Sequence, residues 1–227
     1  MFKFSDGKYK DHLVVIGGWA FDYRIFDRME LPYNYIFFCG ESTVDFEAEL
    51  KKTLDKHNVN EISLLGWSQG AFTACDFAGK NPDLIKEIIL AGARQQYEEE
   101  GLREIRKYLI TNKRAYLYRF YRQCFSEIEE DSYQWFRDSL LKSYLKEMSL
   151  AQLISSLEQL GQAKIEPEAL KKLRRIKIVH GSSDSIAPAA EAAQIAHSLP
   201  GSQLITFEKA GHLPFLRKDF KKRLYEH

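Results

Sequence analysis

Short apolar runs alternate with longer amphipathic stretches along this chain. Runs such as HLVVIGG (12–18) are almost continuously apolar, which is typical of strands buried on both faces of a parallel sheet. This pattern predicts six strands, at residues 12–18, 33–39, 61–66, 84–91, 176–180 and 203–207.

Between these runs, apolar residues recur at helical spacing. Phe46, Leu50 and Leu54 mark one face of a helix that we predict over residues 43–57. The same reasoning, together with Gly and Pro as end signals, predicts three further helices of this kind, at residues 69–79, 187–198 and 214–225. Strands that alternate with helices in this way predict an α/β fold, with a mostly parallel central sheet and helices on both faces.

The stretch from Arg94 to Gly161 breaks this rhythm, because it has no strand-like run and its apolar residues keep helical spacing. It predicts three or four helices, at about residues 97–110, 113–125, 132–145 and 149–160. We therefore expect a helical cap of residues 94–161, inserted into a core formed by residues 1–93 and 162–227. Such a cap would lie over the carboxyl edge of the sheet, where open α/β sheets bind their ligands.

Charge and composition exclude several classes of protein. The 227 residues contain 33 Lys and Arg against 32 Asp and Glu, a net charge of +1 that argues against nucleic acid as a partner. No apolar run reaches the ~18 residues of a membrane span, and the first twelve residues lack a secretory signal, so no membrane partner is expected. Cys39, Cys75 and Cys124 are too widely spaced for a disulfide framework or a metal site. We expect a cytoplasmic protein that needs no metal or cofactor.

The most informative motif is Gly66-Trp67-Ser68-Gln69-Gly70, a G-x-S-x-G. It lies between a predicted strand and a predicted helix, where a sharp turn exposes the serine hydroxyl at the top of the sheet. The positive end of the helix dipole then favours negative charge that develops there. Ser68 is therefore the candidate nucleophile.

A serine nucleophile needs a base and an acid that orients the base. Asp184 follows the fifth predicted strand and His212 follows the sixth, so the order along the chain is Ser68, Asp184, His212, as a nucleophile-elbow triad requires. The alternative is that Asp184 only caps the next helix and that His212 is an ordinary loop histidine. For the oxyanion, the expected donors are the backbone N–H groups of Gln69 and Trp19.

These residues resemble the α/β-hydrolase superfamily, and within it the pimeloyl-[acyl-carrier protein] methyl ester esterases of biotin synthesis. The resemblance covers most of the chain and is densest in HLVVIGGWAFDYRIF, LLGWSQGAFTACDFAGKNPDLIKEIIL and FEKAGHLPF. The chain departs from the family at Gly17, where the family usually has a histidine, at Ala71, and in residues 40–43, which lack the usual Asp-x-x-Gly-x-Gly loop.

The resemblance implies a serine carboxylesterase that hydrolyses an acyl methyl ester carried on acyl carrier protein, with basic cap residues gripping the acidic carrier. From Arg103 to Arg122 the chain has seven basic residues and one acid, Glu104, although this run can also be an ordinary solvated face balanced by acids nearby. The candidate docking residues are Lys113, Arg114, Arg119 and Arg122.

Aromatic residues are frequent in the predicted cap, and most of them are expected to pack between helices. Three aromatic residues are candidates for lining an acyl-binding tunnel: Trp19, Phe72 and Phe120. Two other functions stay open at this point. One is C–C bond hydrolysis or 2,5-elimination of the menaquinone-synthesis type by the same triad, and the other is a non-catalytic receptor on a hydrolase scaffold.

Overall fold

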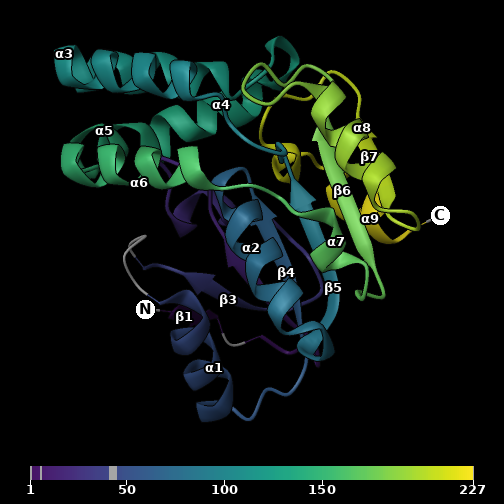
Figure 1. Cartoon of the computed structure of the whole chain (residues 1–227). Helices are drawn as coiled ribbons and strands as arrows, with labels where there is room; N and C mark the ends of the chain where they lie inside the picture. The colour runs from purple at the N-terminus through teal and green to yellow at the C-terminus, as the bar shows by residue number, and fades with distance from the viewer. Residues whose placement is uncertain (1, 6, 41–44, 227) are drawn as a thin grey trace.

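In the computed structural model, which describes residues 2–5, 7–40 and 45–226, a seven-stranded sheet forms the centre of the molecule (Figure 1). The strands lie in the order β1-β3-β2-β4-β5-β6-β7 and all pair in parallel except β1, which is antiparallel to β3. Their bounds are β1 Phe2–Ser5, β2 His12–Ile16, β3 Asn34–Phe38, β4 Ile62–Trp67, β5 Ile85–Ala91, β6 Ile176–Gly181 and β7 Gln203–Phe207. The predicted α/β fold and the six predicted strands are confirmed.

The strand that the sequence pattern missed is β1. It is only four residues long and lies at the edge of the sheet, with alternately half-buried and exposed side chains. Its pairing with β3 depends on contacts across more than thirty positions of the chain, such as Phe2 opposite Phe38, and not on a local apolar run.

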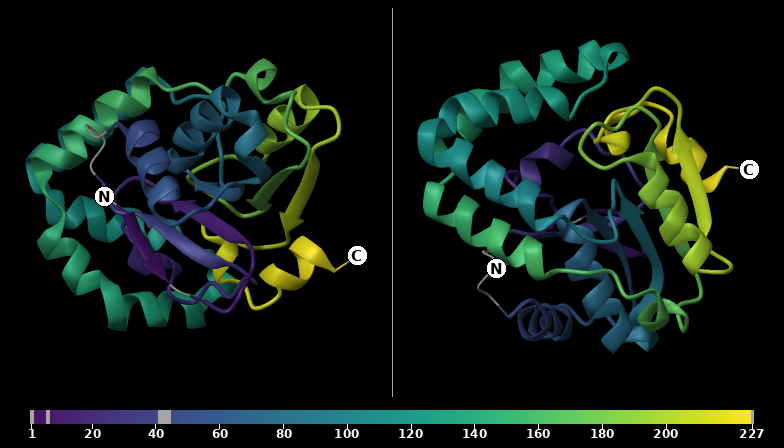
Figure 2. Two further views of the ribbon diagram at one scale, coloured as in Figure 1. Left: turned by 90° about the horizontal axis from the view of Figure 1, so that it is seen from below. Right: turned by 45° about the horizontal axis from the view of Figure 1, so that its top comes forward.

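Helices cover both faces of the sheet, as expected. Figure 2 shows α1 (Phe46–Lys56), α2 (Gln69–Lys80) and α8 (Ala189–Ser198) on one side and α9 (Phe220–Tyr225) on the other. The short helices η1 (Tyr23–Phe26), η2 (Pro82–Leu84) and α7 (Pro167–Leu170) complete the layers. The predicted start of the first helix at residue 43 lies outside the described residues.

The prediction of a single closing helix over residues 214–225 is wrong. This segment divides into η5 (Pro214–Leu216) and α9, because Arg217 has extended backbone angles, φ −71° and ψ 136°.

Between β5 and β6 in the sequence, residues 99–162 form a layer of helices, which lies on the side where the parallel strands end (Figure 1). These are α3 (Glu99–Gln123), η3 (Glu127–Glu129), α4 (Glu130–Phe136), η4 (Arg137–Leu141, a π-helix), α5 (Lys142–Glu147) and α6 (Leu150–Gln162). Helix α3 is kinked at Asn112 (φ −158°, ψ 86°), between the two helices predicted for this segment.

The helical layer is tied to the turn that follows β2. The Trp19 indole N–H donates to the carbonyl of Leu153 at 3.1 Å, and the Tyr121 hydroxyl donates to the carbonyl of Ala20 at 2.8 Å. Phe21 packs edge-on against Tyr121, with ring centroids 5.0 Å apart. These buried contacts fix the layer over the strand ends. No helix in the described part of the chain has the length and apolarity to cross a membrane.

Candidate active site

Ser68 stands at a sharp turn between β4 and α2. Its backbone angles, φ 53° and ψ −117°, lie in a region that side-chain-bearing residues rarely adopt. The turn is held because the Ser68 N–H donates to the carbonyl of Ala91 at 2.9 Å, and the Ala71 N–H donates to the carbonyl of Ser68 at 3.0 Å. The Ser68 side chain does not cap α2, so its hydroxyl is left for chemistry.

The two glycines of the motif make this turn possible. A Cβ at Gly66 would lie 2.7 Å from the Cα of Ala71, and a Cβ at Gly70 would collide with the carbonyl oxygen of Ile16. Only glycine allows the backbone of α2 to approach β2 and β4 so closely. The G-x-S-x-G spacing is thus a steric requirement of the turn.

His212 and Asp184 are brought together from two different loops. His212 Nδ1 lies 2.7 Å from the Asp184 carboxylate oxygen Oδ2, and both residues are buried. The second carboxylate oxygen, Oδ1, accepts from the N–H groups of Ile186 and Ala187 at 2.8 and 2.9 Å. Asp184 therefore stabilises the turn before α8 and also contacts His212; it does not cap α8 itself, which begins at Ala189 without a side-chain cap.

The environment of Asp184 keeps its carboxylate ionised. Burial by itself raises the pKa of Asp184, but the neighbouring His212 and the hydrogen bond from Ala187 outweigh it, so that the pKa lies below 3.8. A buried carboxylate that stays charged favours the His212 tautomer with hydrogen on Nδ1, which leaves Nε2 free to accept a proton.

Gly92 makes room for the His212 ring, a role that was not predicted from the sequence. Its φ is +54°, and a Cβ there would lie 3.0 Å from both Cε1 and Nδ1 of His212. The backbone of His212 is also held, because the Trp67 indole N–H donates to its carbonyl at 2.8 Å. The position of Gly92 directly after the predicted strand 84–91 was the feature of the sequence that could have indicated this role.

The turn after β2 lies against Ser68. A Cβ at Gly18 would be 3.1 Å from the Cβ of Ser68. Among the hydrogen bonds of the described residues, none uses the backbone N–H of Trp19 or of Gln69. The two backbone N–H groups are therefore available as donors. The side chains of both residues donate elsewhere, Trp19 to the carbonyl of Leu153 and Gln69 to the carbonyl of Ser156.

Tyr97 is a site residue that the sequence did not indicate. Its hydroxyl lies 3.5 Å from the Ser68 Oγ, and Arg94 stacks over its ring at 4.7 Å. Burial is the main reason that the pKa of Tyr97 is raised, so the phenol stays protonated at neutral pH. Tyr97 lies in an irregular segment before α3, and no local pattern sets it apart from the many aromatic residues that follow.

The three aromatic residues proposed to line an acyl tunnel lie in two separate groups. Phe120 packs edge-on against Trp19, with ring centroids 5.1 Å apart. Phe72 packs against Tyr97 at 6.1 Å. A cavity of about 650 Å³ passes the turn after β2, with Gly18, Gln69 and Leu153 in its wall.

The four basic residues selected for carrier docking all lie on the second half of α3. Three of them contact other cap residues: Lys113 donates to the carbonyl of Met148 at 2.6 Å, Arg119 stacks on Tyr108 and Tyr116 at 5.1 and 5.6 Å, and Arg122 donates to the carbonyl of Phe125 at 3.0 Å. Arg114 and Arg119 are exposed.

Within residues 2–5, 7–40 and 45–226, no group of three or more His, Cys, Asp or Glu side chains is arranged to hold a metal ion. At the site, the His212 imidazole contacts the Asp184 carboxylate, and the Ser68 hydroxyl has Tyr97 as its hydrogen-bond partner; among the described residues no hydrogen bond joins Ser68 to His212. These groups can transfer protons and form a covalent serine intermediate.

Comparison with known proteins shows which family and fold the chain resembles. The model of the alpha/beta hydrolase fold family matches residues 17–219. A pimeloyl-[acyl-carrier protein] methyl ester esterase from Nitrosomonas europaea is 23% identical over 229 residues, covering 90% of this chain and 89% of that protein. One from Neisseria meningitidis is 26% identical over 171 residues, covering 67% of this chain and 62% of that protein.

Solved structures show the same fold. An esterase from Exiguobacterium antarcticum superposes with a TM-score of 0.81 at 21% identity, covering 98% of this chain and 93% of that one. A bromoperoxidase from Bacillus anthracis also has a TM-score of 0.81, at 18% identity and with the same coverage. At these sequence identities, the similarity of the structures shows that the fold is shared and does not identify a substrate.

Proposed function

The chain belongs to the alpha/beta hydrolase fold family, and we propose that it is a serine carboxylesterase whose catalytic triad is Ser68, His212 and Asp184. The observation that carries this proposal is the contact between the loop of Asp184 and the loop of His212. The 2.7 Å contact between His212 and Asp184 supplies an oriented base at the edge of the sheet where Ser68 occupies its strained turn. The relatives that are named as esterases support the same reaction class.

The proposed reaction follows from the roles of these groups. His212 Nε2 accepts the proton of the Ser68 hydroxyl, and Oγ attacks the carbonyl carbon of the ester. The oxyanion is stabilised by the backbone N–H groups of Trp19 and Gln69, near the amino terminus of α2. His212 then protonates the leaving alcohol, and water releases the acid by the same relay in reverse. Asp184 stabilises the imidazolium through its charge.

The proposed substrate is the methyl ester of an acyl chain carried on acyl carrier protein. The names of the curated relatives support this substrate, as does the basic run on α3. Of the four candidate docking residues, Arg114 and Arg119 are exposed and would meet an acidic carrier directly, whereas Lys113 and Arg122 would have to exchange their contacts with Met148 and Phe125. Trp19, Phe72 and Phe120 would contact the acyl chain.

The test of the reaction is Ser68→Ala, assayed on short p-nitrophenyl esters and with a fluorophosphonate probe. The parent should hydrolyse the esters and be labelled, and the variant should do neither, because the nucleophile is absent. A variant that hydrolyses the esters as fast as the parent would remove Ser68 from the mechanism. A folded parent that is not labelled would instead support a non-catalytic scaffold.

The test of the substrate is incubation with pimeloyl-carrier methyl ester, followed by detection of methanol release. Arg114→Glu together with Arg119→Glu should raise KM for the carrier-bound ester about tenfold or more and leave the p-nitrophenyl ester unaffected, because the charge contact is with the carrier. Active hydrolysis of short esters with no methanol release would limit the proposal to the esterase reaction.

A further inference from the structure

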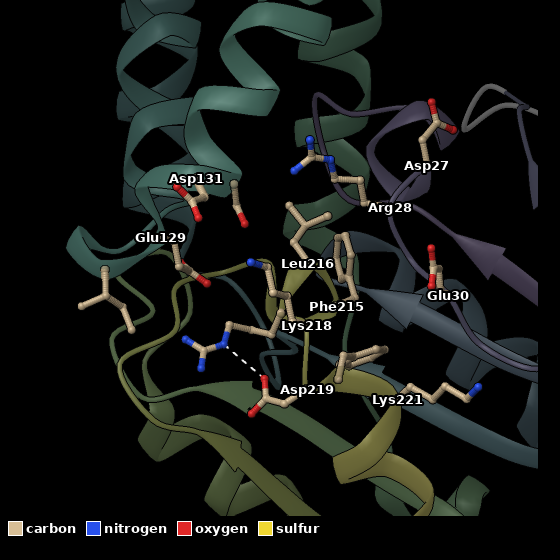
Figure 3. A pocket seen from close by; sticks show the side chains of 14 residues that line it. Asp27, Arg28, Glu30, Glu129, Asp131, Phe215, Leu216, Lys218, Asp219 and Lys221 are labelled. Atoms are coloured by element: carbon tan, nitrogen blue, oxygen red, sulfur yellow. Dashed lines mark hydrogen bonds and ion pairs between the residues drawn. The ribbon is translucent and has the colours of Figure 1, made fainter.

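Glu129, in the short helix η3 after α3, is a buried carboxylate outside the triad. Its side chain is 5% exposed, and it lines a cavity of about 850 Å³ between the cap and the segment that follows His212 (Figure 3). None of the ion pairs formed by the described residues includes Glu129. A buried charge without a cationic partner is unfavourable unless its hydrogen bonds compensate for the lost hydration.

The hydrogen bonds of Glu129 lead to the loop that carries His212. One oxygen, Oε2, accepts from the N–H of Gly211 at 2.8 Å and from the N–H of Ser126 at 2.9 Å. Gly211 immediately precedes His212, and its N–H is 82 positions along the chain from Glu129. The carboxylate thus joins a helical segment inserted after β5 to a loop that follows β7.

Two further hydrogen bonds reinforce this junction. The His212 N–H donates to the carbonyl of Cys124 at 2.8 Å, and the Ser185 hydroxyl, next to Asp184, donates to the carbonyl of Gln123 at 3.0 Å. Residues 123–129, which we call the clasp, therefore contact both loops of the triad. The two loops also contact each other directly, through Asp184 and His212 and through the Ser183 N–H, which donates to the carbonyl of Ala210 at 2.9 Å.

The fit between the clasp and the His212 loop is close. A Cβ at Gly211 would lie 2.6 Å from the carbonyl oxygen of Cys124 and 2.9 Å from Oε2 of Glu129. Gly211 is not at positive φ, so an alanine there would be excluded by these contacts and not by its own backbone. The sequence pattern Ala210-Gly211-His212 is therefore adapted to the clasp as well as to the loop.

We propose that Glu129 is a positioning residue of the active site, whose carboxylate holds the His212 loop against the end of α3. The proposal rests on the proposed function, because a position of His212 matters for activity only if His212 is the base. It also implies that the placement of α3, which carries the proposed docking residues, is communicated to His212 through the clasp.

The test compares Glu129→Ala with Glu129→Gln, using kcat and KM on a p-nitrophenyl ester and the rate of fluorophosphonate labelling of Ser68. Alanine removes the acceptor, so the imidazole should lose its alignment and kcat and labelling should fall together by about ten- to a hundredfold, with KM within about twofold of the parent. Glutamine can place its carbonyl oxygen at Oε2, so it should restore most of kcat. The matched control is Glu130→Ala, an exposed glutamate that directly follows the clasp, which should behave as the parent.

Thermal unfolding followed by circular dichroism separates positioning from stability, since kcat is measured well below the midpoint of each variant. A folded Glu129→Ala variant with the kcat of the parent would refute the inference and leave the esterase function standing. If this variant does not fold, Gly211→Ala decides, because it separates the same two surfaces and should lower kcat in the same way. A parent that neither hydrolyses the ester nor is labelled would refute the function and the inference together.

Discussion

Replacement of Asp184 by Asn tests whether this carboxylate orients His212 or only caps a turn. The two carboxylate oxygens have different partners: Oδ1 accepts from two backbone N–H groups, of Ile186 and Ala187, and Oδ2 contacts His212 Nδ1. An asparagine has one oxygen and one NH₂ group, so it can satisfy only one of these environments. If its oxygen stays at the Oδ1 position, its NH₂ group faces His212 and imposes the tautomer with hydrogen on Nε2, which cannot accept a proton from Ser68.

The size of the effect follows from the orientation that the amide prefers. Turning the oxygen toward His212 would leave the N–H groups of Ile186 and Ala187 facing the NH₂ group, and each unsatisfied buried donor costs about 1–3 kcal/mol. The inactive orientation is therefore favoured by about 2–6 kcal/mol. At about 1.4 kcal/mol per factor of ten, this predicts a fall in kcat/KM of about 30-fold to 20,000-fold.

The assay is hydrolysis of a p-nitrophenyl ester at pH 7.5, with Ser68→Ala as the background and Asp83→Asn, at an exposed position, as the matched control. The unfolding midpoint of Asp184→Asn should stay close to that of the parent, because the oxygen that caps the turn is kept. A folded Asp184→Asn variant that retains more than about a third of the parent kcat/KM would show that the carboxylate serves the turn alone. The proposed role in the triad would then be wrong.

Three further substitutions test separate parts of the site. Gly92→Ala should lower kcat about tenfold or more, measured on the same ester, because its Cβ would lie 3.0 Å from the His212 ring at a φ of +54°; an unchanged kcat would mean that the ring has room to move. Tyr97→Phe should lower kcat/KM about two- to tenfold, the value of one neutral hydrogen bond to Ser68, and no change would reduce Tyr97 to a packing residue. The pKa of His180 is lowered from 6.5, mainly because the side chain is buried. Below about pH 6.5 the unfolded chain therefore binds a proton at His180 more readily than the folded chain does, and the folded state loses stability that it has at higher pH. His180→Gln should therefore show a smaller drop in unfolding midpoint between pH 7.5 and pH 5.5 than the parent, and an equal drop would contradict the assignment to His180.

The parts of the fold that were predictable are those encoded by neighbouring residues. The buried strands could be predicted because a strand covered on both faces needs a continuous apolar run, as in β4, where every residue is buried. The turn at Ser68 could be predicted because Gly66 and Gly70 have no room for a Cβ. The edge strand β1 and the break before α9 were missed, since the first depends on pairing with β3 and the second on the backbone of one residue, Arg217.

Long-range contacts decided the rest of the site. Tyr97 reaches Ser68 across 29 positions, and Glu129 reaches Gly211 across 82, so neither role leaves a local pattern in the sequence. The charges on α3 illustrate the same limit, because Lys113 is in a basic run, yet its hydrogen bond to the carbonyl of Met148, 35 positions away, arises only when the helices pack.

The sequence by itself determined the α/β hydrolase fold and the order of Ser68, Asp184 and His212, because apolar periodicity and the space required by glycines act over a few residues. Only the tertiary structure decided that Asp184 divides its two oxygens between a turn and His212, and that a buried carboxylate of the cap holds the loop of His212. The physical reason is that hydrogen-bond partners and burial are set by segments that meet only after the chain has folded.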